Sequence, residues 1–154
     1  MIYYTTTRTD GSEYDRILRM CRKFATLAGL MVDSPDHFAS GFLESIDKFV
    51  VREEPVGDSP AGRCPTPTRR LICTYDDEFI EVIEGFSSGL LSWHGPQLPA
   101  DLHLLRPDGS TVLGTVVAEY HVYLELTDRE AAEWLREWPH SLIAQDVWDA
   151  GAPL

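Results

Sequence analysis

Four polar side chains alternate along one predicted strand, namely Glu119, His121, Tyr123 and Glu125. Alternate residues of a strand point to the same face, so these four would lie side by side. Carboxylates, an imidazole and a phenol can together donate and accept protons, or supply part of a metal site. The same spacing is typical of any strand face that contacts water. Because no H-E-x-x-H motif, calcium-binding loop or Cys/His ligand pattern is present, we expect no metal site and no cofactor.

A second motif, Gly85-Phe86-Ser87-Ser88-Gly89, matches the pattern G-x-S-x-G. Over these five residues the chain resembles the turn that exposes the nucleophilic serine of the α/β-hydrolase family. The resemblance implies a hydrolase with Ser87 as nucleophile, a histidine as base and an aspartate that orients the histidine. The apolar run that follows ends at Gly95-Pro96, which leaves too short a segment for the required helix, so a turn between strands is preferred. The candidate partners are His121 or His140 and Asp108 or Asp101.

Charge is divided unevenly along the chain. Residues 1–70 carry ten acidic and ten basic side chains, whereas residues 71–154 carry fifteen and three. All of the formal net charge of −12 therefore belongs to the second half. This sign disfavours direct binding of nucleic acid, which needs clustered Lys and Arg. A basic protein partner is the more plausible ligand.

The densest acidic segment spans residues 76–84. Its carboxylates predict an electrostatic surface that speeds association with a positively charged protein and fixes its orientation. Tyr75, Phe79 and Trp93 are candidate apolar anchors beside it. Ordinary solubility is the alternative explanation. The predicted partner-binding carboxylates are Asp76, Asp77, Glu78, Glu81 and Glu84.

The first half of the chain predicts helices with little strand. Residues 2–7 are β-branched and aromatic and predict a short strand, and helical spacing of apolar residues runs from Ser12 to Gly29. A second helix is expected to begin at Ser34, and a strand to begin near residues 49–51. The Pro- and Gly-rich residues 54–68 predict a long exposed loop.

The second half predicts mainly antiparallel strands. Residues 71–75 and 79–83 suggest a hairpin, with a helical turn over 79–83 as the alternative. Pro107-Asp108-Gly109 predicts a second hairpin turn. In the strand from Glu119 to Leu126, Tyr120, Val122, Leu124 and Leu126 would face the core. A capping box, Thr127 with Glu130, opens a final helix.

Together these elements predict a single α+β domain over residues 1–154, with an antiparallel sheet of several strands, two N-terminal helices and one C-terminal helix. The three cysteines show no C-x-x-C spacing, and no secretory leader or membrane span is evident, so we expect a cytoplasmic protein. Two lysines stand against eleven arginines and asparagine is absent, which indicates a GC-rich, bacterial genome.

These features favour a non-catalytic acidic protein that binds a basic partner. In size, acidity and lack of a catalytic motif, the chain is similar to bacterial immunity proteins that neutralise toxins, although no sequence motif links it to them. One alternative is a small serine hydrolase that uses Ser87. Another is a small-ligand-binding or regulatory domain whose pocket is formed by the uncharged stretch 85–100, with Phe86, Trp93 and His94.

Overall fold

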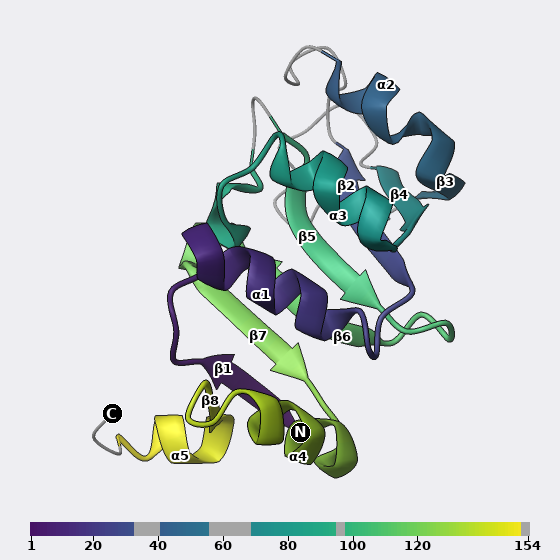
Figure 1. The fold of residues 1–154 in the computed structure, drawn as a ribbon. Helices are drawn as coiled ribbons and strands as arrows, with labels where there is room; N and C mark the ends of the chain where they lie inside the picture. The colour runs from purple at the N-terminus through teal and green to yellow at the C-terminus, as the bar shows by residue number, and fades with distance from the viewer. Residues whose placement is uncertain (33–40, 56–68, 95–97, 152–154) are drawn as a thin grey trace.

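The structure is a computed structural model that describes residues 1–32, 41–55, 69–94 and 98–151. Within these residues, eight strands form one antiparallel sheet in the order β3-β4-β2-β5-β6-β7-β1-β8 (Figure 1). The strands are β1 (Ile2–Thr5), β2 (Leu27–Val32), β3 (Val50–Pro55), β4 (Arg69–Thr74), β5 (Ala100–Leu105), β6 (Thr111–Val116), β7 (His121–Glu125) and β8 (Leu142–Ala144).

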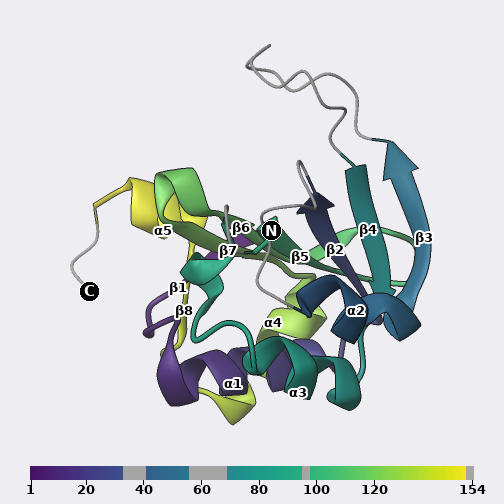
Figure 2. The same ribbon diagram turned by 90° about the horizontal axis from the view of Figure 1, so that it is seen from above.

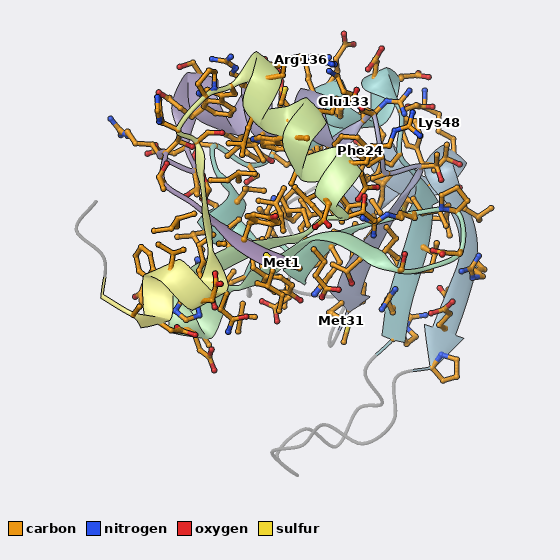
Figure 3. The ribbon with its side chains drawn as sticks, turned by 90° about the horizontal axis from the view of Figure 1, so that it is seen from below. Met1, Phe24, Met31, Lys48, Glu133 and Arg136 are labelled. Atoms are coloured by element: carbon orange, nitrogen blue, oxygen red, sulfur yellow. The ribbon has the colours of Figure 1, made fainter. Side chains whose placement is uncertain are left out.

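The helices are distributed unequally over the two faces of the sheet. Helices α1 (Gly11–Cys21), α3 (Asp77–Glu84) and α4 (Asp128–Glu137) lie together on one face, which we call the helical face (Figure 2). On the opposite, open face, α5 (Gln145–Asp149) lies at the end of the sheet formed by β1 and β8 (Figure 2). Short α2 (Phe42–Ile46) precedes β3. In Figure 3, Glu133 and Arg136 mark the helical side and Met31 the open side.

The core lies between the sheet and the helical face. Apolar residues at helical spacing in α1, including Tyr14, Ile17 and Leu18, pack with Ile80 and Ile83 of α3 against alternate residues of the central strands. The polar tips of buried aromatic rings are also bonded, since the Tyr75 hydroxyl donates to Leu18 O at 2.5 Å and Trp93 Nε1 donates to the Tyr14 hydroxyl at 3.3 Å.

The α+β class and the antiparallel sheet agree with the sequence prediction, but the N-terminal helices do not. Helix α1 ends at Cys21, and residues 27–29, which were expected to lie in the same helix, begin β2 instead. This strand pairs with β4 and β5 on its two sides, so its apolar sequence fits a central strand as well as a helix. Residues 34–40 of the second predicted helix, and 56–68 of the predicted loop, lie outside the described residues.

The predicted hairpin over residues 71–83 is also wrong in its second arm. Residues 79–83 belong to α3, which is the alternative that the sequence left open. Asp76 caps this helix, because its Oδ1 accepts a hydrogen bond from Phe79 N at 2.8 Å. The carboxylates of Asp77 and Glu78 lie in the first turn, where the helix dipole stabilises them.

Two local predictions in the second half are confirmed. Gly109 turns the β5–β6 hairpin with a φ of 87°, and Asp108 Oδ1 accepts from Ser110 N at 2.9 Å. The capping box of α4 is formed, with Glu130 N donating to Thr127 Oγ1 and Thr127 N donating to Glu130 Oε2. Among the described residues, no helix is long and apolar enough to cross a membrane.

Glu130 links α4 to the β5–β6 hairpin, so replacing Glu130 should lower stability more than replacing the cap residue Thr127. Its carboxylate also accepts two hydrogen bonds from Arg106, at 3.0 and 2.5 Å, where both side chains are largely buried. Thr127→Ala should therefore cost about 1 kcal/mol of unfolding free energy. Glu130→Ala should cost about 2 kcal/mol or more, since it also leaves Arg106 without its carboxylate. Urea denaturation checks this order, and equal losses would show that the Arg106 pair adds nothing.

Candidate functional site

The acidic segment 76–84 is largely engaged within the molecule. Asp76 caps α3. Asp77 Oδ1 lies 3.5 Å from Arg22 Nε and 3.9 Å from Arg19 Nη1. Glu78 forms an ion pair with Lys48. Basic residues of the first half thus pair with two of the five carboxylates of the acidic segment. Glu81 remains exposed on α3.

The predicted apolar anchors are not on the surface. Tyr75, Phe79 and Trp93 are all buried in the main core cluster. The ring of Phe79 makes edge contacts with the rings of Tyr75 and Phe49, at centroid distances of 6.1 and 5.3 Å. A partner cannot contact these rings without opening the core, so their predicted role as surface anchors is wrong.

Glu84 lies in the contact between α3 and α1. It is half-buried, and its Oε1 has no hydrogen-bond partner among the described residues. Burial raises the pKa of Glu84 to about 7, and the nearby Asp15 carboxylate adds to this effect, while Arg19 opposes it. Glu84 therefore gains a proton as the pH falls through about 7.

Ser87 does not form the predicted catalytic arrangement. Its side chain is 4% exposed, and its hydroxyl donates to Gly89 O at 2.8 Å. His121 pairs with Val116 at one end of β6, whereas Asp108 lies in the turn before the other end of that strand. The five residue-to-residue steps from Thr111 to Val116 span roughly 17 Å, so His121 and Asp108 are too far apart for a triad.

The predicted polar strand face is only partly formed. His121, Tyr123 and Glu125 alternate with buried Val122 and Leu124 along β7, as expected. Glu119 belongs instead to the short 3-10 helix η4 (Val117–Glu119), and its Oε2 lies 3.8 Å from His121 Nδ1. Among the described residues, no group of three His, Cys, Asp or Glu side chains is placed to hold a metal ion.

Aromatic side chains from three elements gather at the start of β7, and we call this group the aromatic end. The Tyr4 ring lies 5.9 Å from the His121 ring and 5.7 Å from the Trp148 ring, centroid to centroid. With Tyr120, these residues border a hollow of about 230 Å³ that Thr5 and Thr7 also line. The aromatic end is thus Tyr4, Tyr120, His121 and Trp148.

Tyr120 is unusual in both exposure and backbone conformation. Although it was predicted to face the core, its side chain is 80% exposed. The turn of η4 interrupts the expected alternation, and Tyr120 caps it with φ 56° and ψ 33°. This left-handed conformation costs a residue with a Cβ atom about 1 kcal/mol. A large exposed ring held in this conformation marks the aromatic end as a candidate functional site.

Residues 85–100, which were predicted to form a ligand pocket, line the observed hollows only in part. Trp93 is buried, and Phe86 packs edge-on against Phe42 at a centroid distance of 5.1 Å. His94 borders a second hollow, of about 420 Å³, next to Tyr120. Neither hollow includes a Lys or Arg among its lining residues. The side chains that line these hollows therefore come mostly from outside the predicted stretch.

Comparison of the chain with protein-family models, curated proteins and solved structures gave no significant match. Sequence reasoning missed Tyr4 and Trp148 as site residues and assigned Tyr120 to the core. The apolar pair Val147 and Trp148 between two aspartates is a sequence feature that could have indicated an exposed apolar surface there.

The contact at Glu84 predicts an unusual pH dependence of stability. The folded-state pKa of about 7 exceeds the ordinary value of 4.5, so its contribution is present below pH 4.5 and is lost as the pH rises through 7. Glu84→Gln should make the protein more stable at pH 8, by on the order of 1 kcal/mol after allowance for its partial exposure.

Urea denaturation of wild type and variants at pH 5 and pH 8 measures this effect. Glu81→Gln is the comparison variant, because Glu81 is exposed and its charge adds only a smaller repulsion to Glu84. It should stabilise the protein less than Glu84→Gln does at pH 8. A loss of stability at pH 8 in Glu84→Gln would show that the ionised carboxylate is stabilising.

Proposed function

We propose that the protein is a non-catalytic binding protein that engages a positively charged protein surface through its aromatic end. The observation that carries this proposal is the pair of exposed aromatic rings, Tyr120 at 80% and Trp148 at 47% exposure, beside one hollow. Tyrosine and tryptophan are the residues most often found at the energetic centre of protein interfaces.

The charges around the aromatic end favour a basic partner. Exposed Glu119 lies next to Tyr120, and exposed Asp146 and Asp149 flank Trp148 in α5. Within the described residues, no Lys or Arg forms an ion pair with these three carboxylates. An apolar centre with an acidic rim attracts and orients a cationic surface.

The proposal moves the predicted contact surface away from α3. Carboxylates that already hold Arg19, Arg22 and Lys48 would have to exchange one cation for another, which leaves little net gain. The carboxylates beside the aromatic end, Glu119, Asp146 and Asp149, would not have to give up a bound Lys or Arg from the described residues. The specific form of this proposal is an inhibitor of the immunity type, which covers the cationic surface of a toxin without chemistry.

Differential capture tests the proposal. Wild-type protein, the double variant Tyr120→Gly/Trp148→Ala and Val51→Ala are immobilised and exposed to extract of the source cells. Wild type and Val51→Ala should retain the same basic protein, released at roughly 1 M salt. Val51 is the matched control, because it is 58% exposed but lies on β3 near the other edge of the sheet.

The double variant should bind that protein at least about 30-fold more weakly, which corresponds to about 2 kcal/mol. Calorimetric titration of the purified pair measures the loss. Equal binding by all three proteins would contradict a contact at the aromatic end, and retention of no basic protein by wild type would contradict the binding function itself.

Tyr120→Gly alone should separate binding from stability. Glycine adopts a positive φ without steric cost, and little packing is lost with a ring that is 80% exposed. We expect the unfolding free energy to rise by up to about 1 kcal/mol while binding falls. Thermal denaturation checks the sign, and a destabilised variant would show that the ring packs against the fold.

A further inference from the structure

A continuous row of paired residues crosses the open face of the sheet. From β4 to β1, successive partners in the strand register are Ile72, Gly29, His103, Gly114, Tyr123 and Tyr4. Buried Ile72 lies outside the main core cluster, whereas its neighbours Leu71 and Cys73 belong to it, which places the row on the face opposite the core. His103 stands in this row with a glycine on each side.

Each glycine allows a long side chain to lie flat over the sheet. A Cβ atom on Gly29 would lie 3.0 Å from Arg70 Nε, and one on Gly114 would lie 2.3 Å from Cζ of Tyr123. The guanidinium of Arg70, on β4, therefore extends over β2, and the phenol of Tyr123, on β7, extends over β6. Both neighbouring strands flank β5, so Arg70 and Tyr123 approach His103 from opposite sides.

The Arg70 guanidinium makes no hydrogen bond to the part of the chain that the structure describes. Its Nε is buried and has no partner there. The nearest carboxylate oxygen, Glu54 Oε2, lies 4.0 Å away, while the other oxygen of Glu54 accepts from Arg52 at 2.8 Å. A guanidinium carries five donors and a permanent charge, so Arg70 can donate hydrogen bonds to an anion from solution.

His103 supplies an acceptor in the same place. Its Nδ1 lies 2.8 Å from Asp101 O, and because a carbonyl oxygen can only accept, Nδ1 carries the proton. Burial lowers the pKa of His103, and the charge of Arg70 lowers it further, against the opposing effects of Asp101 and Glu125. The imidazole is neutral at pH 7, and its Nε2 lone pair accepts no hydrogen bond from the described residues.

We infer that Arg70, His103 and Tyr123 form a binding site for a phosphate group on the open face of the sheet. The guanidinium and the phenol donate to phosphate oxygens, and Nε2 of His103 accepts from the P–O–H group of the monohydrogen form. A carboxylate has acceptors for Arg70 and Tyr123 but no proton for Nε2. Phosphate is therefore preferred over carboxylate, whether free or as a monoester. This inference is independent of the proposed function.

Nuclear magnetic resonance of the His103 imidazole tests the site. The protein is titrated at about pH 6.5 with inorganic phosphate, with glycerol 3-phosphate and with acetate, at constant ionic strength. We expect a saturable shift of the His103 signals with at least one of the two phosphates and a weaker response to acetate. The tighter of the two phosphates identifies free phosphate or a monoester as the preferred form.

Two variants and a matched control make the test specific. Arg70→Gln should weaken phosphate binding at least about tenfold, and Tyr123→Phe, which removes only the hydroxyl, several-fold. Arg69→Gln should bind as wild type, because Arg69 Nη1 already contacts the Glu53 carboxylate at 3.2 Å. Thermal denaturation confirms that each variant is folded. Absence of a saturable shift in wild type, or equal affinity in Arg70→Gln and Arg69→Gln, would overturn the inference.

Discussion

Three helices, α1, α3 and α4, cover one face of an eight-stranded sheet, and most other features of the protein depend on that arrangement. Side chains alternate between the two faces of a strand, so burying one face leaves every second residue of the central strands for the other. The helical face takes the apolar set, including Leu30, Leu104, Leu113 and Leu124. The open face is left free for Arg70, His103 and Tyr123, groups that a core would exclude.

The same arrangement explains why the uneven distribution of charge along the sequence is partly evened out in the folded structure. Helix α1 comes from the basic first half, and α3 and α4 come from the acidic second half, yet all three pack on one face (Figure 2). Arg19 and Arg22 therefore meet Asp77, and Lys23 meets Glu133 and Glu137. These exposed pairs contribute little stability individually. Their consequence is that unpaired acidity remains elsewhere, including at the aromatic end.

Sequence patterns predicted those elements whose signals are local. The cap of Thr127 with Glu130 and the turn at Gly109 depend on neighbouring residues alone, and both are formed. The helix prediction extends too far, over residues 27–29, because these residues begin a central strand, which lacks the alternation that would identify it. The phosphate site depends on strand order, which no local pattern encodes. Gly29 and Gly114 are the sequence features that could indicate the site, because glycine within a strand marks the close approach of another group.

The central functional claim is that partners contact the aromatic end rather than the acidic helix α3. Site-specific photo-crosslinking tests this directly, with benzoylphenylalanine introduced in place of Tyr120 in one protein and in place of Glu81 in another. Both positions are exposed, so each reports contact without opening the core. We expect a crosslinked basic protein from position 120 and none from position 81. Crosslinking from position 81 alone would place the contact surface on α3 and contradict binding at the aromatic end.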